Sequence, residues 1–303
     1  MNLNVIDRMN MLKLNQEVAK EKTREFYTLC HFEPKYGIFP GSLPVSLSRN
    51  DLKFVKERYS VCDKTDGVRY MMYMDKKSIY LVDRLMNFYY LCENTTQDSN
   101  CVYDGELVDD ISGNGKQYYM IFDVFASNGR TVKDIQNHKV RIGTILNYYP
   151  VTISKDITIN VKRFHYANKF SQCLNQKLPY KTDGYIFTPM FKKIFNGTDR
   201  RTYKWKECSE HTIDFEIQTD GHLYLYDKNN NKMKVCEMMY ESDDVYNIPS
   251  IVECRIVKND EGTCWKFVKE RSDKDRPNST MTYFSTIKVI EENISLDDLN
   301  NLK

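Results

Sequence analysis

The chain has 303 residues, of which 41% are hydrophobic and 28% are charged, and its formal net charge is only +2. This composition excludes a highly charged disordered chain and allows one large or two modest domains. No apolar run reaches the roughly 18 residues of a membrane span, and the first residues lack a signal peptide's apolar core. We therefore expect a soluble, non-secreted protein with no membrane partner. The nine cysteines include no Cys-x-x-Cys pair, which favours free thiols over a disulfide framework or a structural zinc site.

The predicted elements change character along the chain. A mixture of charges and helix formers predicts a helix at 15–27, which the Pro- and Gly-containing stretch 40–44 ends. Short aromatic and β-branched runs then predict antiparallel strands up to about residue 125. Further on, we expect a helix at 132–148, strands at 184–189 and 202–205, a strand-rich stretch from 211 to about 267, and a short acidic helix at 296–302.

Charge is distributed unevenly along the chain. Residues 162–207 hold eleven Lys and Arg against three acids, a balance of +8, whereas residues 208–261 hold five against twelve, a balance of −7. The change of sign near residue 210 predicts a domain boundary, although two solvated faces of one domain would give the same count. Four basic residues form either a solvated face or a track for RNA phosphates, namely Lys192, Lys193, Arg200 and Arg201.

Several short motifs carry candidate chemistry. Lys64 precedes an Asp-Gly turn and is followed by Arg69, a setting that favours a lysine amine as a nucleophile. On a strand, Lys204 and Lys206 would share one face, which suits a polyphosphate, while Trp205 between them would pack into the core. Carboxylates such as Glu106 and Asp183 are suitable ligands for Mg²⁺ or Mn²⁺, and Arg271 with Lys274 would contact the outer phosphates. Together these residues predict nucleotidyl transfer through a lysine.

These residues also carry a family resemblance. The chain resembles the covalent nucleotidyltransferases and, among them, the GTP:RNA guanylyltransferases that cap mRNA. Six motifs occur in the family's order, namely KxDGxR at 64–69, DGE at 104–106, an aromatic strand at 118–123, DGxIFTP from 183, KWK at 204–206 and RxDKxxPN from 271. The segment 39–46 resembles the one that precedes the nucleophile in cellular-type capping enzymes. Each string alone is weak, but six in order are specific.

The resemblance implies a role for each matched residue. Lys64 would attack the α-phosphate of GTP, expel pyrophosphate and pass the bound GMP to a 5′-diphosphate RNA end. The string Lys-Thr-Asp-Gly recurs at Lys181, but only the first copy is followed by the family's arginine. The implied GTP-binding residues are Arg69 and Glu106 at the ribose, Phe122 stacked on guanine, Lys181 at the guanine edge, Asp183 for metal binding or catalytic geometry, Lys204 and Lys206 at the α-phosphate, Arg271, Asp273 and Lys274 at the outer phosphates, and Arg84 at a less specific position. Glu106, Asp183 and Asp214 are the implied residues for Mg²⁺ or Mn²⁺.

The fold implied by the resemblance is α+β. It consists of a nucleotidyltransferase domain of antiparallel sheets flanked by helices at 1–210, with 288–303 as a candidate return to it, and of an OB-fold barrel at 211–287. The last motif lies on that barrel, so the cleft would have to close on GTP and open again for RNA.

Two alternatives remain open at this stage. An ATP-dependent DNA or RNA ligase shares the KxDG nucleophile and the two-domain plan, and a non-catalytic RNA-binding OB-fold protein would keep the barrel without the complete set of transfer residues. The partners implied for a capping enzyme are GTP, 5′-diphosphate RNA, the phosphorylated C-terminal tail of RNA polymerase II, and a separate RNA triphosphatase and cap methyltransferase. The last two follow because about 35 residues remain outside the two domains, which is too few for either enzyme. A cellular enzyme would be nuclear, whereas one from a large DNA virus would belong to a cytoplasmic viral factory or the virion.

Overall fold

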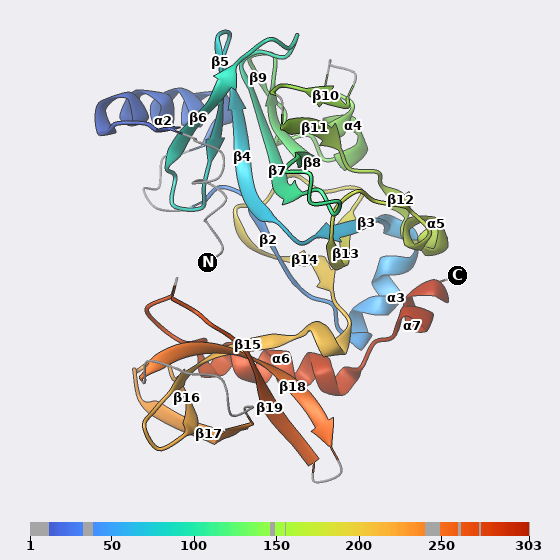
Figure 1. Cartoon of the computed structure of the whole chain (residues 1–303). Helices are drawn as coiled ribbons and strands as arrows, with labels where there is room; N and C mark the ends of the chain where they lie inside the picture. The colour runs from blue at the N-terminus through green and yellow to red at the C-terminus, as the bar shows by residue number, and fades with distance from the viewer. Residues whose placement is uncertain are drawn as a thin grey trace. The chain divides into compact units, whose positions relative to one another are not determined.

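Two compact units make up the chain (Figure 1). The first comprises Met1–Ser46, Lys53–Trp205 and Asn300–Lys303, and the second comprises Leu47–Leu52 and Lys206–Leu299. The computed structural model describes residues 12–32, 39–145, 149–154, 156–239, 249–259, 262–272 and 274–302. Both units are built on β-sheet with few helices, which confirms the predicted α+β class.

The larger sheet of the first unit has nine strands in the order β1-β6-β5-β4-β7-β8-β11-β10, with β9 beside β8. They are β1 (Leu12–Lys13), β4 (Val68–Met74), β5 (Ser78–Val82), β6 (Phe88–Glu93), β7 (Cys101–Asp109), β8 (Gln117–Ser127), β9 (Arg130–Thr131), β10 (Val151–Thr152) and β11 (Ile157–Val161). All neighbours are antiparallel except β8 and β11. Strand β4 is buried from Tyr70 to Met74 because each of its faces contributes to a separate apolar core.

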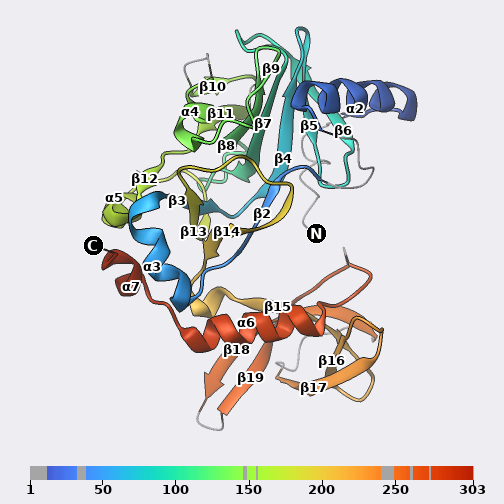
Figure 2. The same cartoon turned by 180° about the vertical axis from the view of Figure 1, so that it is seen from behind.

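Helices cover both faces of this sheet (Figure 2). Helix α2 (Gln16–Cys30) buries Phe26 in the core on one face, and the side chain of Asn15 caps its first turn. The short helix α4 (His138–Ile142) lies on the other side, where Ile142 packs against the second core. The sheet therefore has little freedom to shift, which is a requirement for placing functional side chains accurately.

The smaller sheet of the first unit has the order β12-β3-β13-β14-β2. Its strands are β2 (Ser42–Ser46), β3 (Tyr59–Thr65), β12 (His165–Tyr166), β13 (Thr182–Pro189) and β14 (Gly197–Trp205), and the nearby short helices are α3 (Arg49–Arg58), η1 (Ala167–Lys169) and α5 (Phe170–Leu174). A turn at Asp66 and Gly67 leads from β3 into β4 and so joins the two sheets. A Cβ atom on Gly67 would lie 2.3 Å from the carbonyl oxygen of Leu107, so only glycine fits this turn.

The second unit is a closed barrel with the strand order β15-β16-β17-β19-β18. Its elements are η2 (Cys208–Glu210), β15 (Thr212–Ile217), β16 (His222–Tyr226), β17 (Lys232–Met239), β18 (Ser250–Asn259), β19 (Gly262–Glu270), α6 (Thr280–Glu292) and α7 (Leu296–Asn300). A parallel pair of β17 and β19 closes five otherwise antiparallel strands, as in an OB-fold. Phe215 and Trp265 lie at the centre of the core, and Tyr283 and Ile287 of α6 pack against it.

Several elements differ from those expected. Among the described residues of the predicted helix at 132–148, the helix that forms is α4 and the rest are mostly irregular, and helix α3 occurs where strands were expected. Helix α6 begins inside the range expected for the barrel and runs past its end. The helices expected at 15–27 and 296–302 are confirmed as α2 and α7. Helix α6 packs on the barrel, the second unit extends to Leu299, and Asn300–Lys303 are grouped with the first unit. The predicted domain bounds of 1–210, 211–287 and 288–303 stay a prediction.

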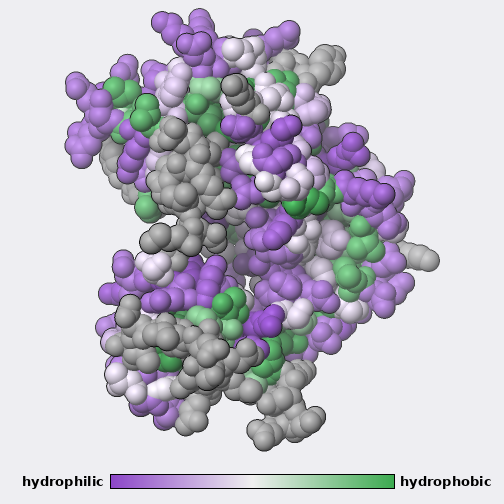
Figure 3. All heavy atoms as spheres, in the orientation of Figure 1, coloured by the Kyte–Doolittle hydropathy of each residue, from purple (hydrophilic) through white to green (hydrophobic). Residues whose placement is uncertain are grey.

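The last features of the fold are the hydropathy of its helices and surface and the state of its cysteines. Over the described residues, no helix is long and apolar enough to cross a membrane. On the face drawn in Figure 3, the described hydrophobic residues form small separate areas among hydrophilic ones. The eight cysteines whose side chains are described are all free thiols, as predicted.

Candidate active site

The predicted nucleophile, Lys64, lies near the end of β3 beside strand β13. Thr65 pairs with Thr182 and Asp63 pairs with Tyr185, so two residues of β13, Asp183 and Gly184, face the single residue Lys64. Gly184 adopts φ 135°, a conformation that side chains disfavour, and this bulge brings Asp183 to Lys64. The Lys64 amino group lies 2.6 Å from Asp183 Oδ1, and both side chains remain partly exposed. The first and fourth motifs therefore meet in an ion pair that solvent can reach.

Glu106 lies on β7, next to the start of β4, the strand that follows the turn after Lys64. It pairs with Arg69 of β4 in the sheet, and its carboxylate accepts a hydrogen bond from the hydroxyl group of Thr65. That hydroxyl group in turn accepts a hydrogen bond from Lys162 at 3.1 Å. The carboxylate is half-buried and stands beside the strand end that carries Lys64.

The guanidinium group of Arg69 has hydrogen-bond acceptors and aromatic rings around it. Its guanidinium group makes two parallel hydrogen bonds to Asp104, at 2.9 and 2.6 Å, and a third to the carbonyl oxygen of Ser42 at 2.8 Å. The guanidinium carbon lies 5.0 Å from the ring centre of Phe39 and 5.2 Å from that of Phe122. Burial raises the pKa of Asp104, and the Arg69 charge opposes that rise. The first and second motifs are thus joined by a buried ion pair.

Phe122 occupies an irregular position on β8. Gly105 pairs with Ile121 and Asp104 pairs with Asp123, which leaves Phe122 as the extra residue of a bulge. Its ring is half-buried rather than packed in the core, as a stacking role would require. Its carbonyl oxygen lies 2.8 Å from Nε2 of His138 in α4.

A buried network behind Phe122 connects β8 with β14. Asp123 makes two hydrogen bonds to Arg141, at 2.8 and 2.9 Å, and Arg141 donates to the carbonyl oxygen of Lys192 at 2.6 Å. The Lys192 amino group donates to Thr202 at 2.9 Å and contacts Asp199. Lys192 is therefore neither part of a solvated basic face nor free to follow RNA phosphates, and that expectation is wrong for it. Lys193 is half-exposed near Asp134, and Arg200 and Arg201 are exposed.

The lysines of the later motifs have different surroundings. Lys204 is partly buried on β14, where it pairs in the sheet with Ile186 of β13 and Ser46 of β2. Trp205 is buried and stacks on Tyr185, which confirms the expected core packing. Lys206 directly follows β14 and is the first residue of the segment Lys206–Leu299 of the second unit.

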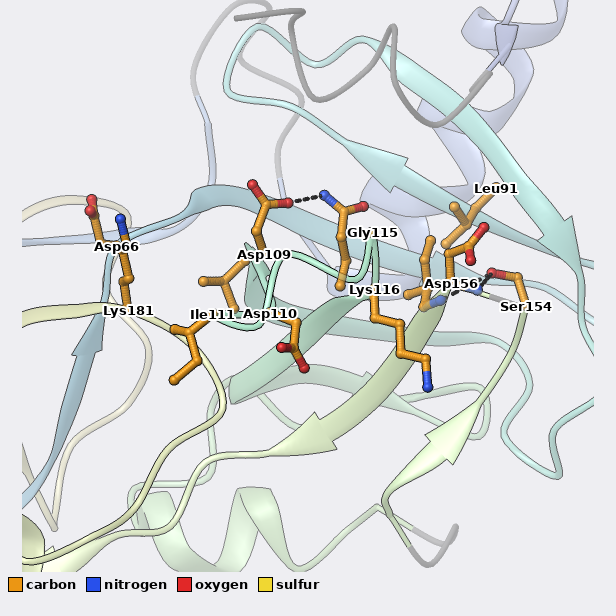
Figure 4. Close-up of a pocket in the computed structure, with 14 residues that line it drawn as sticks. Asp66, Leu91, Asp109, Asp110, Ile111, Gly115, Lys116, Ser154, Asp156 and Lys181 are labelled. Atoms are coloured by element: carbon orange, nitrogen blue, oxygen red, sulfur yellow. Dashed lines mark hydrogen bonds between the residues drawn. The ribbon is translucent and has the colours of Figure 1, made fainter.

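Lys181 and Arg84 are both exposed at the edges of the first unit. Lys181 directly precedes β13, its carbonyl oxygen accepts a hydrogen bond from the Asp66 amide at 3.0 Å, and its side chain lies beside Asp66 at one end of a cavity of about 840 Å³ (Figure 4). Arg84 lies in the turn between β5 and β6. Val82 pairs with Met71 in antiparallel register. Arg84, two residues after Val82, therefore lies at the same end of the sheet as Arg69, two residues before Met71.

The residues of the last motif lie on the barrel together with Asp214. Arg271 makes an ion pair with Asp214 Oδ1 at 2.9 Å, and the Lys274 amino group contacts the other carboxylate oxygen. Asn278 makes two hydrogen bonds to the main chain of Asp214, which fixes the motif against β15. Asp273 lies outside the described residues.

Of the three carboxylates predicted to bind metal, Glu106 and Asp183 lie in the first unit and Asp214 lies in the second. Asp183 pairs with Lys64, Glu106 with Thr65, and Asp214 with Arg271 and Lys274. Over the described residues, no group of three or more His, Cys, Asp or Glu side chains could hold a metal ion. Carboxylate oxygens nevertheless suit Mg²⁺, which usually takes one or two of them and completes its coordination with water and substrate phosphates.

Two residues that organise this site, Lys162 and Asp104, have no role in the sequence-based prediction. Asp104 was visible as the first residue of the DGE motif, yet nothing in its spacing indicates that it binds Arg69. Lys162 was only one of eleven positive charges. Both are buried, with 5% and 2% of their surface exposed, so they stabilise the site from inside the protein.

An antiparallel-sheet unit with a lysine at a KxDG turn, followed by an OB-type barrel, defines a nucleotidyltransferase. Comparison with protein families agrees: the model of the mRNA capping enzyme catalytic domain matches residues 7–208, and that of the mRNA capping enzyme C-terminal domain matches residues 187–300. The chain therefore belongs to the mRNA-capping enzyme family, a family of nucleotidyltransferases.

Individual relatives are similar over most of the chain. The mRNA-capping enzyme subunit alpha of Schizosaccharomyces pombe is 30% identical, covering 86% of this chain and 79% of that protein. The mRNA-capping enzyme of Danio rerio is 27% identical over 86% of this chain, but this chain spans only 49% of its length. Among solved structures, a mycobacterial DNA ligase D complexed with ATP and MES aligns with 80% of this chain and 97% of its own, at 14% identity and a TM-score of 0.45.

Proposed function

We propose that the protein is an mRNA guanylyltransferase that works through a covalent lysyl-GMP intermediate. The observation that carries this proposal is the position of Lys64, 2.6 Å from Asp183 and next to the strands that carry Glu106 and Arg69. Membership of the capping family supplies the reaction class, and this meeting of separate motifs supplies a nucleophile in an accessible, charged setting.

In this proposal GMP is transferred first from GTP to Lys64 and then from Lys64 to RNA. The Lys64 nitrogen, as the neutral amine, attacks the α-phosphorus of GTP. A P–N bond forms, the nitrogen gives up a proton to solvent, and the bond to the β-phosphate oxygen breaks so that pyrophosphate leaves. The terminal phosphate oxygen of a 5′-diphosphate RNA then attacks the same phosphorus. The P–N bond breaks, the lysine regains its proton, and the product is a GpppN cap.

The neighbouring residues would serve this reaction through charge and shape. In the proposal Asp183 orients the Lys64 amine, Glu106 and Arg69 lie at the ribose, and Phe122 offers an aromatic face to guanine. Lys204 and Lys206 would neutralise the α-phosphate, and Arg271 with Lys274 the outer phosphates. Mg²⁺ or Mn²⁺, held by Asp183 and Glu106 together with the phosphates, would offset further negative charge.

Covalent labelling tests the proposal directly. Incubation with α-labelled GTP and Mg²⁺ or Mn²⁺ should leave acid-labile, alkali-stable label on the protein. Lys64→Arg should abolish the label, because arginine keeps the positive charge beside Asp183 but is not a nucleophile. Lys181→Ala should still form label, though more slowly if Lys181 contacts guanine, and the exposed control Lys177→Ala should label at the unmodified rate. Label that survives Lys64→Arg and vanishes in Lys181→Ala would assign the nucleophile to the second Lys-Thr-Asp-Gly string.

The same assay separates the two alternative functions. A ligase of the same superfamily would take label from ATP and not from GTP. A non-catalytic RNA-binding protein would take label from neither nucleotide. Preference for GTP, followed by loss of the label on addition of 5′-diphosphate RNA, supports a capping enzyme.

The partners and the location belong to the same proposal. A GMP transferase needs RNA whose 5′ triphosphate has been trimmed, and its product is the substrate of a cap methyltransferase, so both of these enzymes are proposed to act beside it. For a cellular enzyme we propose a nuclear location and recruitment by the phosphorylated tail of RNA polymerase II. For an enzyme of a large DNA virus, the location would be a cytoplasmic viral factory or the virion.

A further inference from the structure

Residues 190–196, which join β13 to β14 in the first unit, carry a row of exposed side chains. Their backbone is extended, because the amides of Lys192 and Ile194 donate to carbonyl oxygens of the stretch just before α4. Lys192 is buried, and Ile194 packs against the same apolar core as α2. Successive side chains of an extended chain point to opposite sides, so the residues on either side of these two point outward. These outward residues, here called the exposed row, are Phe191, Lys193 and Phe195.

The exposed row alternates two aromatic rings with one positive charge. The exposed fraction is 66% for Phe191, 49% for Phe195, and 56% for the side chain of Lys193. Residues two apart on an extended chain are about 6.6 Å apart, so the residues that carry the two rings are separated by about 13 Å. Single exposed rings are common on protein surfaces. Two rings in one row with a cation between them form a continuous surface suited to a partner.

Two further cations lie beside the exposed row. The buried amino group of Lys192 donates to the hydroxyl group of Thr202 at 2.9 Å and contacts Asp199. The residues between Asp199 and Thr202 therefore lie next to the segment that carries the row. The pairing of β14 with β2 is irregular at this point, and both residues are exposed. They are Arg200 and Arg201.

One described carboxylate on the surface offsets part of this charge. Asp134 lies 3.6 Å from the amino group of Lys193 and 2.9 Å from that of Lys133. Asp199 is buried and is already neutralised by Lys192. The two exposed arginines leave the surface around the row positive overall, which suits a polyanion.

A single residue, Ser42, connects the exposed row to the candidate active site. Its hydroxyl group donates to the carbonyl oxygen of Phe195 at 2.6 Å and accepts from the Phe195 amide at 3.2 Å. Its carbonyl oxygen accepts a hydrogen bond from Arg69 at 2.8 Å, and Arg69 lies against the ring of Phe122. A chain bound along the exposed row therefore ends close to the residues proposed to hold the guanosine.

Rings that alternate with cations favour single-stranded RNA over other polyanions. Bases stack on aromatic faces whatever their sequence, while ammonium and guanidinium groups bind the phosphates between them. A phosphorylated peptide would use the same cations, but sites for such peptides are built from clustered arginines, whereas here the rings lie in the row itself.

We propose that Phe191, Lys193 and Phe195, with Arg200 and Arg201 beside them, bind the single-stranded RNA chain that follows the 5′ end. The inference rests on the proposed function, because it assigns a surface of the first unit to the acceptor of that reaction. The two rings hold bases, the cations hold phosphates, and the 5′ end is thereby directed to the active site.

RNA binding tests this surface without any chemical reaction. The probe is a fluorescent single-stranded RNA of about 12 nucleotides, a usual length for such sites, and its anisotropy reports binding. Phe191→Leu and Phe195→Leu keep apolar bulk but lose the ring, so each should weaken binding by about 5- to 150-fold, the effect of one lost base stack. Phe191→Trp keeps a stacking face and should bind normally. The matched control is Phe54→Leu, 59% exposed on α3, which should also bind normally.

The salt dependence of binding tests the cation of the exposed row. Lys193→Gln should reduce the slope of the logarithm of the binding constant against the logarithm of the salt concentration by about 0.7, the value for one phosphate of a single strand. Lys169→Gln, an exposed lysine on η1, should leave the slope unchanged. RNA binding as tight in both leucine variants as in the unmodified protein would overturn the inference.

GMP transfer then relates the bound RNA to the active site. Starting from protein that already carries GMP, Phe191→Leu should raise KM for a 5′-diphosphate RNA of the same length. It should not raise KM for a nucleoside 5′-diphosphate, which has no chain behind its first base. An equal rise for both acceptors would overturn the inference, because the ring would then act on the reacting end and not on the chain.

Two further results separate this inference from other conclusions. If the leucine variants lose binding to a phosphorylated peptide of the polymerase tail but keep RNA binding, the surface belongs to that partner and the inference is wrong. The proposed function fails on a different observation, namely that the unmodified protein takes no label from GTP. RNA binding by anisotropy is measured without GTP, so the two failures are distinguishable.

Discussion

At the scale of single residues, the most tightly held side chain of the candidate site is Arg69. It lies between two aromatic rings and makes a bidentate pair with Asp104, whose side chain is 3% exposed. A pair this deeply buried stabilises the protein only while both partners are present, since either one alone is an uncompensated buried charge. The fixed guanidinium group also determines where the proposed ribose contact and the Phe122 ring can lie.

A comparison of Arg69 with the exposed Arg84 tests this view. Arg69→Met should lower the free energy of unfolding by about 3–5 kcal/mol, because it leaves Asp104 buried without its partner. Arg84→Met, in an exposed turn, should change it by no more than about 0.5 kcal/mol. Urea unfolding of the two variants beside the unmodified protein measures both values, and similar effects of the two substitutions would contradict the burial argument.

The sequence predicted which residues belong to the site better than it predicted their hydrogen-bond and ion-pair partners. Spacing within a motif pointed to Lys64, Arg69 and Glu106, and all three meet at neighbouring strand positions. Their partners come from distant parts of the chain, such as Lys162, almost a hundred residues after Lys64. A count of charges cannot distinguish a buried lysine from an exposed one, and this is why Lys162 and Lys192 were assigned to a basic stretch and not to the interior.

At the scale of elements, helix α6 of the second unit shows that local propensity alone does not decide the type of an element. Its sequence, TMTYFSTIKVIEE, is rich in β-branched and aromatic residues, which favour strands when taken alone. Ser279 caps its first turn, and Tyr283 and Ile287, four residues apart, share the face that packs on the barrel. Packing therefore overrode propensity. In the range 132–148, by contrast, five of the described residues form a helix, α4, and of these His138 and Arg141 are buried.

Helix α4 has a further role, because it places His138 beneath the bulge that carries Phe122. The imidazole group is buried, touches the ring of Phe164, and bonds to the carbonyl oxygen of Phe122. Burial, helped by Arg141 and Lys192, lowers the pKa of His138 below 6.5 against the opposing effect of Asp123. The folded protein thus prefers the neutral ring.

This preference predicts a pH dependence of stability. Below pH 6.5 the unfolded chain binds a proton at His138 more readily than the folded chain does, so the free energy of unfolding should fall as the pH falls from 6.5 towards the lowered pKa. His138→Gln keeps an N–H donor but does not titrate, and its stability should fall less over the same range. Urea unfolding at pH 7.5, 6.5 and 5.5 measures the difference, and identical slopes for both proteins would contradict a neutral buried His138.

At the scale of the whole molecule, part of the positive and negative charge is used in ion pairs within each unit, which the small net charge does not show. Some of the cations counted between residues 162 and 207 neutralise carboxylates inside the first unit, as Lys162 and Lys192 do. In the barrel, the acids are partly neutralised by the last motif, where Arg271 and Lys274 bind Asp214. The charge that remains for a triphosphate or an RNA end is therefore smaller than the segment count suggests, and it is tied to particular residues.

The cations of the barrel predict a difference between the two steps of the reaction. The β- and γ-phosphates of GTP leave as pyrophosphate in the first step and are absent in the second. If Lys274 serves them, Lys274→Ala should slow label formation from GTP and its reversal by added pyrophosphate equally, because both pass through one transition state. Removing one charge-assisted contact of about 1.5–3 kcal/mol corresponds to roughly 10- to 150-fold.

Transfer of GMP from labelled protein to 5′-diphosphate RNA should by contrast stay near the unmodified rate in Lys274→Ala, since no pyrophosphate takes part. Lys269→Ala is the matched control: this lysine is 63% exposed on β19, pairs with Glu253 and lies outside the motif, so both steps should be unaffected. Single-turnover assays of each step measure the rates separately. An equal loss in both steps would show that Lys274 supports the barrel as a whole, through Asp214, and not the leaving phosphates.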